Sequence, residues 1–135
     1  MCAGVFLNWG TQRLSNTLLI DDDREVRLSI RTVLQGVNHG VSDFDNAKDA
    51  MRAAKDKKFD IAIIDLLLPD IDGLELIREI RINYPDMKTI AISGGGAVLH
   101  KNYLPAAAAF GAEVTLEKPF EAEALINAIA ALNVN

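Results

Sequence analysis

Five polar residues follow short apolar runs of this 135-residue chain, and their types suit phosphoryl chemistry. They are Asp21, Asp22, Asp65, Ser93 and Lys118. Three carboxylates at close range repel one another unless a positive charge lies between them, and Mg²⁺ prefers oxygen ligands of this kind. An ammonium and a hydroxyl could each hold one oxygen of a phosphoryl group. Together the five side chains would form a receptor for a phosphoryl group attached to one of the acids.

Each of these residues also has an ordinary structural explanation when it is taken alone. An aspartate such as Asp65 at a strand end is commonly a turn residue or a helix cap, and the acidic run 21–23 is typical of a solvated helix start. A serine after a strand is often part of a turn, and lysine–proline pairs are common. Asp70 and Asp72 are expected to shape the loop after Asp65 and to cap the next helix. Only the joint placement of the five residues favours a common site.

Short apolar runs alternate with helical patterns from residue 17 onward, which predicts parallel βα units with right-handed crossovers. The isoleucine-rich run before Asp65 is typical of a strand that is covered on both faces. The fourth helix is expected to carry Pro105 in its first turn and to end at Gly111. The fold class is therefore α/β, a doubly wound parallel sheet of five strands with five helices. Strands are expected at 17–20, 40–44, 59–65, 89–93 and 114–116.

The predicted sheet explains how residues far apart in the sequence could share a site. The carboxyl ends of parallel strands lie at one edge of an open sheet, and ligands bind there. The acidic pair follows the first strand and Asp65 the third, while Ser93 and Lys118 follow the fourth and fifth. We therefore expect these residues in one shallow cleft. The glycine run 94–96 would lie beside it as a loop with little backbone restraint.

Composition limits the classes of function. The net charge of −5 argues against nonspecific binding of nucleic acid or of an anionic membrane. A single cysteine, Cys2, excludes an internal disulfide and fits a reducing compartment. No apolar run is long enough to cross a bilayer, and the first residues lack the basic region of a signal peptide. We expect a cytoplasmic protein with one domain at 17–135, after an extension at 1–16 that is either disordered or docked through Trp9.

Four motifs carry a resemblance to a known family. They are Leu19-Ile20-Asp21-Asp22-Asp23, Ile64-Asp65-Leu66-Leu67-Leu68-Pro69 with Gly73, Ile92-Ser93-Gly94, and Lys118-Pro119-Phe120. From about Thr17 to the C-terminus, the chain resembles the receiver domain of two-component response regulators. The resemblance implies a flavodoxin-like sheet with strand order 2-1-3-4-5, and a signalling switch rather than an enzyme.

By this resemblance Asp65 is the phosphoacceptor, which takes a phosphoryl group from a phosphohistidine on a histidine kinase or a phosphotransfer protein. Asp22 would bind Mg²⁺ directly and Asp21 largely through water. Asp65 and the backbone carbonyl of Leu67 would complete the protein ligands. The acyl phosphate is labile in water, so slow autodephosphorylation would end the signal.

Ser93 and Lys118 would act on the phosphorylated state. Ser93 matches the switch hydroxyl that moves toward the phosphoryl group, and Lys118 would pair with the acceptor carboxylate or its phosphoryl group. The family often has a cis peptide bond between this lysine and Pro119. Most receivers carry Tyr or Phe three residues before the lysine, where this chain has Thr115. Since threonine cannot sweep the volume of a ring, we expect the output surface to lie elsewhere or the glycine loop to carry the change.

Two further positions bear on the lifetime of the phosphorylated state. In the family, the positions of Leu67 and Gly95 influence how fast the acyl phosphate is hydrolysed. The side chain of Leu67 offers no hydrogen bond to an attacking water, so we expect a long-lived phosphorylated state.

Three functions are compatible with these residues. The first is a phosphorylatable switch that acts by protein contact or relays its phosphoryl group, without an output domain of its own, although a receiver cut from a longer regulator would have the same sequence. The second is a degenerate receiver that only binds a partner, and Thr115 is the one feature in its favour. The third is a small Mg²⁺-dependent phosphohydrolase, which would usually place its nucleophile after the first strand and need a cap domain. The downstream protein and homodimer formation stay open.

Overall fold

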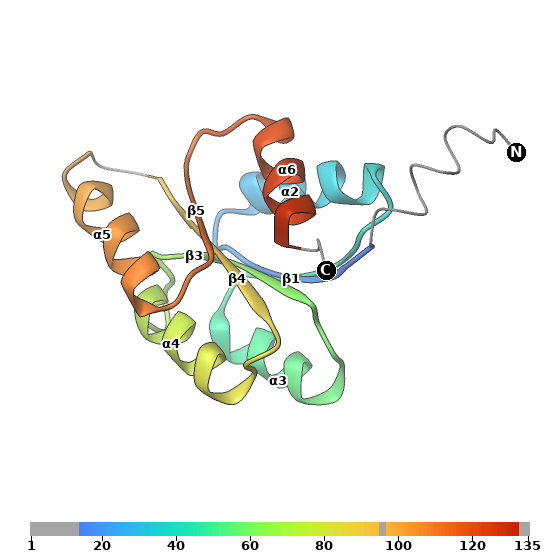
Figure 1. Ribbon diagram of the computed structural model, residues 1–135, viewed down its shortest axis with the longest axis horizontal. Helices are drawn as coiled ribbons and strands as arrows, with labels where there is room; N and C mark the ends of the chain where they lie inside the picture. Colours follow the sequence, from blue (N-terminus) through green and yellow to red (C-terminus); the bar gives the residue numbers. More distant parts are fainter. Residues whose placement is uncertain (1–13, 95–96, 133–135) are drawn as a thin grey trace, which may run out of the picture.

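Five parallel strands form one sheet in the order β2-β1-β3-β4-β5 (Figure 1). The computed structural model describes residues 14–94 and 97–132. Its strands are β1 Asn16–Ile20, β2 Gly40–Phe44, β3 Ile61–Asp65, β4 Lys88–Ser93 and β5 Val114–Glu117. Its helices are α2 Arg24–Gly36, α3 Ala47–Asp56, α4 Gly73–Asn83, α5 Ala97–Phe110 and α6 Ala122–Leu132. Within these ranges the prediction of a doubly wound α/β sheet with five strands and five helices is confirmed. The expectations for Trp9 and Gly95 concern residues outside them.

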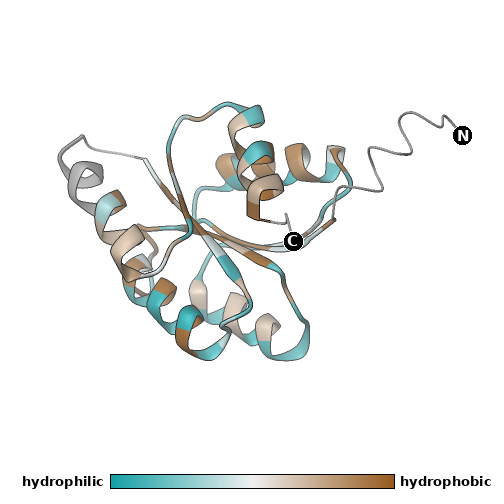
Figure 2. Cartoon of the chain, viewed as in Figure 1, coloured by the Kyte–Doolittle hydropathy of each residue, from teal (hydrophilic) through white to brown (hydrophobic). Residues whose placement is uncertain are grey.

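Helices cover both faces of the sheet, as the apolar central strands require. α2 and α6 lie on one face, and α3, α4 and α5 lie on the other (Figure 1). Ala62 and Ile64 of β3 pack with α3 and α4, while Ile63 between them packs with α2 and α6. Figure 2 shows hydrophobic residues along these central strands. Full burial of one such aliphatic side chain contributes roughly 1.5–3 kcal/mol, so the strand that carries Asp65 is a rigid base for it.

Polar side chains start the helices that follow the carboxyl ends of the strands. Asp23 accepts hydrogen bonds from the backbone N–H groups of Glu25 and Val26 at the start of α2. Asn46 caps α3, and Asp72 caps α4 as the sequence predicts. These side chains satisfy backbone donors that a helix start leaves unpaired, and so they fix where each loop turns back into a helix.

Asp70 serves a different helix from the one predicted. Its carboxylate accepts hydrogen bonds from the N–H groups of Ala47, at 3.1 Å, and Lys48, at 2.9 Å, at the start of α3. The prediction that Asp70 caps the next helix is therefore wrong. β2 and β3 flank β1 in the sheet, so the loops that follow them meet past the end of β1. The sequence alone does not show which loop lies beside which helix.

Helix α5 begins earlier than the sequence indicates. Pro105 lies inside the helix, so its predicted place in the first turn is wrong. A proline inside a helix removes a backbone donor and its ring clashes with the preceding turn, at a cost of about 3 kcal/mol. Alanine, leucine and lysine residues in the stretch 97–104 before it nevertheless favour helix. The predicted end is correct, because Gly111 has a φ of 123°. The N–H groups of Gly111 and Ala112 both return to the carbonyl of Ala107.

Gly73 allows the start of α4 to pack against the loop after β3. A Cβ at this position would lie 2.4 Å from the Cα of Leu66, which is far too close for two carbon atoms. The Gly73 N–H also donates to the Leu66 carbonyl at 3.1 Å. Since Leu66 directly follows Asp65, this close approach holds the backbone beside the acid.

Candidate functional site

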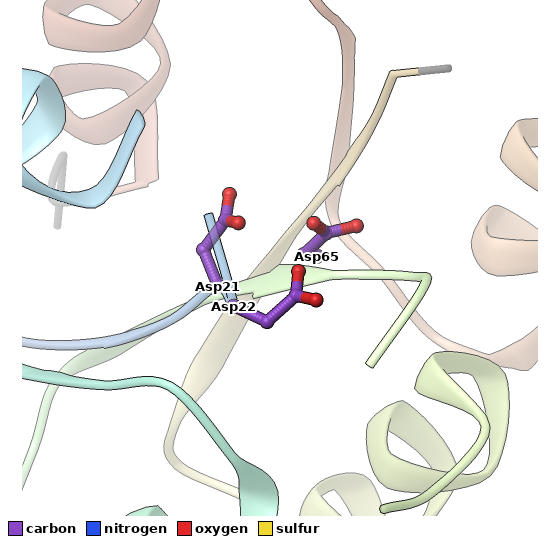
Figure 3. Close-up of side chains that lie close together, drawn as sticks. All are labelled: Asp21, Asp22 and Asp65. Carbon is purple, nitrogen blue, oxygen red and sulfur yellow. The ribbon is translucent and has the colours of Figure 1, made fainter. Parts of the chain in front are cut away.

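The ends of β1 and β3 bring three carboxylates together. Asp21 and Asp22 directly follow β1, and Asp65 is the last residue of the neighbouring strand β3. Ile20 and Ile64 are partners in the ladder, so Asp21 and Asp65 follow side by side. Figure 3 shows the three side chains gathered at this edge. One carboxylate oxygen of each lies within 4.8 Å of the others.

Lys118 reaches the same cluster from the end of β5. Its Nζ lies 2.9 Å from Asp21 Oδ2 and 3.1 Å from Asp65 Oδ2. Burial by itself would lower the pKa of Lys118, but the hydrogen bond to Asp21 and the charges of Asp21 and Asp65 raise it above its usual value. The ammonium therefore stays charged and offsets part of the repulsion between the acids. Its peptide bond to Pro119 is cis, as the resemblance implies.

Asp21 is the buried member of the cluster. Its side chain is fully enclosed, and its Oδ1 accepts a hydrogen bond from the Asp23 N–H at 2.9 Å. Burial is the largest influence and raises the pKa of Asp21 from 3.8 to about 6, against the hydrogen bonds from Lys118 and Asp23. The negative charge of Asp65 raises this pKa further. The ionised form of Asp21 is thus costly in the folded chain and favours a nearby cation.

A cleft of about 870 Å³ opens over the other two acids. Asp22, Asp65 and Lys118 all line it, together with Leu67. Asp22 is exposed, whereas Asp65 is only 5% exposed and its Oδ1 accepts the Leu67 N–H at 2.9 Å. The remaining walls come from the start of α2, from Gly94 after β4 and from the loop after β5. They are formed by Asp23, Glu25, Val26, Ser29, Ile30, Gly94, Pro119 and Phe120.

Ser93 ends β4 and Gly94 follows it, and the Lys118 N–H donates to the Ser93 carbonyl at 2.7 Å. Ser93 is buried, and among the described residues its Oγ has no hydrogen-bond partner. A buried hydroxyl without a partner is costly, so Ser93 favours a hydrogen-bonding group nearby, but like Asp21 it is not among the residues that line the cleft. A Cβ on Gly94 would lie 2.8 Å from Lys118 Cδ. The glycine therefore leaves room for the lysine to reach the acids.

Thr115 does not belong to the cluster. It lies within β5 and is paired with Ala91 of β4, two residues before Ser93 in that strand. Its side chain is half-buried. The sequence-based expectation about Thr115 concerns how the site communicates with the surface, and it stays a prediction.

Arg27 is a residue of this region that the sequence analysis did not select. Its Nη1 donates to the backbone carbonyl of Asp21 at 2.8 Å, and its Nε donates to Asp43 Oδ2 at 3.0 Å. Its place at the end of the first turn of the helix after the acidic run was a signal, since a long side chain there can reach back to the strand end. The partner Asp43 could not be found in this way because it lies in β2.

The donor set of the cluster fits a hard divalent cation. All three carboxylates offer oxygen atoms, and Mg²⁺ binds proteins through few carboxylates while it keeps several waters. The exposed position of Asp22 at the cleft leaves space for such waters. The acidic cluster is thus able to hold a metal ion at the carboxyl edge of the sheet.

Fold and site together define a class of protein. A doubly wound sheet carries three acids, a lysine and a buried hydroxyl at the ends of β1, β3, β4 and β5. Such an edge suits the reversible attachment of a phosphoryl group to a carboxylate.

Comparisons with known proteins agree with this class. The response regulator receiver domain family matches residues 17–130. The receiver protein CpdR of Brucella abortus is 30% identical over 116 residues, which cover 86% of this chain and 94% of CpdR. The transcriptional regulator NtrC of Azospirillum brasilense is 34% identical over 119 residues, but the chain spans only 24% of that protein. A solved putative response regulator from Chloroflexus aurantiacus matches 91% of this chain and all of its own, with 25% identity and a TM-score of 0.81.

The chain belongs to the response regulator receiver domain family. A receiver domain is the phosphoacceptor of two-component signalling, and it is typically phosphorylated by a kinase rather than acting as an enzyme on other substrates. The family thus implies a histidine kinase or phosphotransferase as a partner. In the ranges that the structure describes, no helix is both long and apolar enough to cross a membrane.

Proposed function

We propose that Asp65 is the residue that takes the phosphoryl group. Among the three acids, Asp65 alone both lines the cleft and contacts Lys118. Asp21 contacts Lys118 but is enclosed beneath the cleft, and Asp22 lines the cleft without a described contact to the lysine. The combination of access and a neighbouring ammonium is the observation that carries the assignment.

We assign the cation to the same cluster. Asp22, Asp65 and the backbone carbonyl of Leu67 would hold Mg²⁺ directly, and Asp21 would hold it largely through water. Mg²⁺ would supply positive charge that neutralises phosphoryl oxygens. The exposed side chain of Asp22 and the hydrogen bond between Asp65 Oδ1 and the Leu67 N–H support this arrangement, because both acids are already oriented toward the cleft.

The chain's own side chains perform the transfer. A carboxylate oxygen of Asp65 attacks the phosphorus of a phosphohistidine, the P–O bond forms, and the P–N bond breaks. The imidazole leaves with the electron pair of that bond and takes up a proton. Lys118 balances the charge of the phosphoryl group, and the Ser93 hydroxyl donates a hydrogen bond to one of its oxygens.

The new charge on Asp65 would then change the surface of the domain. A phosphoryl group that recruits Ser93 also pulls on Gly94. The domain would signal by altered contact with a downstream protein or by passing the phosphoryl group to a second histidine. The Ser93 hydroxyl, which has no hydrogen-bond partner in the part of the chain that the structure describes, and the contact of Lys118 with Asp65 argue against a degenerate receiver that only binds.

A small phosphodonor tests the assignment without the cognate kinase. We expect the purified chain, incubated with acetyl phosphate and Mg²⁺, to gain the mass of one phosphoryl group, and to gain none with excess EDTA. Borohydride reduces an acyl phosphate to an alcohol, so peptide mapping after reduction should find homoserine at position 65. Equal labelling in EDTA would overturn the metal assignment, and homoserine at another acid would overturn the choice of Asp65.

The side chain of Leu67 is expected to prolong the phosphorylated state. It is 38% exposed and lines the cleft beside Asp65, where it offers no hydrogen bond to an attacking water. Replacing Leu67 by Asn should shorten the half-life of phosphorylated Asp65 about 2- to 10-fold, since one hydrogen bond is worth roughly 0.5–1.5 kcal/mol. The measurement is the decay of the phosphorylated mass after the donor is removed.

The matched control for Leu67→Asn is Ile82→Asn. Ile82 is 67% exposed on α4 and does not line the cleft, so this variant should decay like the wild type. A half-life of Leu67→Asn equal to or longer than that of the wild type would contradict the role given to Leu67.

A further inference from the structure

The peptide groups on either side of Asp21 are each held by a neighbouring element. The carbonyl of Asp21 accepts a hydrogen bond from Arg27 Nη1 at 2.8 Å. The N–H of Asp21 donates to the carbonyl of Phe44 at 3.1 Å, so β2 fixes the preceding peptide group. The orientation of both acids at the end of β1 therefore depends on a helix residue and on the neighbouring strand.

Arg27 is itself fixed by Asp43. Arg27 Nε lies 3.0 Å from Asp43 Oδ2, and the two side chains are only 15% and 13% exposed. Asp43 stands within β2, where it is the ladder partner of Leu19. A partly buried ion pair anchored on a strand holds its geometry better than an exposed pair between two flexible side chains. The guanidinium thus connects Asp43 of β2 to the backbone at the end of β1.

The ion pair with Asp43 also reduces the effect of the positive charge of Arg27 on the cation site. An unpaired guanidinium beside Asp21 would repel a cation in the acidic cluster. The carboxylate of Asp43 accepts from both Arg27 and Arg31, so it offsets one of their two positive charges. Arg27 can therefore give the Asp21 carbonyl a strong donor, and Asp43 reduces the repulsion between this guanidinium and a bound cation.

We infer that Arg27, held by Asp43, is a positioning residue for the cation site. It orients the peptide group that joins Asp21 to Asp22, and it thereby sets the affinity of the cluster for a divalent cation. The inference rests on the proposed function, because it takes the acidic cluster to be the Mg²⁺ site. Groups that orient metal ligands without touching the metal commonly change metal affinity by about 10- to 100-fold.

The test is the dissociation constant of Mg²⁺, measured by calorimetric titration of the purified chain without any phosphodonor. Replacing Arg27 by Met should weaken Mg²⁺ binding about tenfold. Arg27→Lys should recover part of this loss, because a lysine keeps one donor near the Asp21 carbonyl. Asp43→Asn should also weaken binding, since it leaves the guanidinium without its compensating charge.

Arg31→Met is the matched control. Arg31 comes one turn later in α2, and its described ion pair is with the same carboxylate, Asp43. We expect its Mg²⁺ affinity to stay within about twofold of the wild type. Urea unfolding in EDTA, run on every variant, separates a loss of fold from a loss of metal affinity. If Arg27→Met does not fold, the Arg27→Lys and Asp43→Asn variants decide.

The possible failures are distinguishable. Wild-type Mg²⁺ affinity retained in a folded Arg27→Met variant, or an equal loss in Arg31→Met, would overturn the positioning role alone. A wild-type chain that binds no Mg²⁺ would overturn the metal assignment of the proposed function and this inference with it.

Discussion

Replacing Asp65 by Asn should abolish phosphorylation by acetyl phosphate while the chain stays folded. The amide is close in size to the carboxylate, but it is a far weaker nucleophile and it removes one of the negative charges that face the cleft. Lys118 would keep its contact with Asp21 at 2.9 Å, so the neighbouring side chains need not rearrange. Intact-mass measurement should find no phosphorylated species at times when the wild type is fully modified.

Asp72→Asn is the matched control for this loss. Asp72 follows Asp65 in the same loop and caps α4 through the Leu74 N–H. Asparagine is an equally good helix cap, so this variant should keep both the fold and the wild-type rate of labelling. Labelling of Asp65→Asn at any other acid in the cluster would contradict the assignment of Asp65.

The sequence predicted the fold class and the composition of the cluster for a shared physical reason. Buried parallel strands are marked by apolar runs such as the one before Asp65, and each run stops where the chain leaves the sheet. Because parallel strands all point the same way, the residues after them meet at one edge. Strand ends can be recognised locally, so the gathering of Asp21, Asp65 and Lys118 needed no knowledge of tertiary contacts.

Features that depend on which loop lies beside which helix could not be predicted in this way. Asp70 caps α3 rather than the next helix, and Asp43 anchors Arg27 from a strand that is 16 residues away in the sequence. Neither contact follows from local periodicity. The start of α5 was missed for another reason. The rule that places proline in a first turn is only a tendency, and the residues before Pro105 include alanine, leucine and lysine, which also favour helix.

Replacing Asp21 by Asn should stabilise the metal-free domain at neutral pH. The folded-state pKa of Asp21 is raised to about 6, chiefly by burial, whereas an unfolded chain would titrate near 3.8. An acid whose pKa is raised on folding favours the fold only while it is protonated. The stability that protonated Asp21 contributes is complete below 3.8, its pKa in the unfolded chain, and is lost as the pH rises through about 6, its pKa in the folded chain.

The size of the stabilisation expected for Asp21→Asn follows from the shift in the pKa of Asp21. Each pKa unit corresponds to about 1.4 kcal/mol, so the ionised Asp21 costs the folded state on the order of 1–3 kcal/mol at pH 7. Urea unfolding in EDTA at pH 7 should therefore give Asp21→Asn a free energy of unfolding that is higher than that of the wild type by this amount. The difference should shrink toward zero at pH 4. The exposed neighbour Asp22 provides the control, because Asp22→Asn should change the metal-free stability little.

Saturating Mg²⁺ should make the wild type more stable than Asp21→Asn, the reverse of their order without metal. A cation that binds only the folded chain stabilises it in proportion to the logarithm of its concentration above the dissociation constant. The wild type should gain this stabilisation, and Asp21→Asn and Asp22→Asn should gain much less of it. Asp21 would then destabilise the metal-free fold and also contribute to the stabilisation of the fold by Mg²⁺. Parallel stability curves for wild type and Asp21→Asn between pH 4 and pH 8 would refute this account of Asp21.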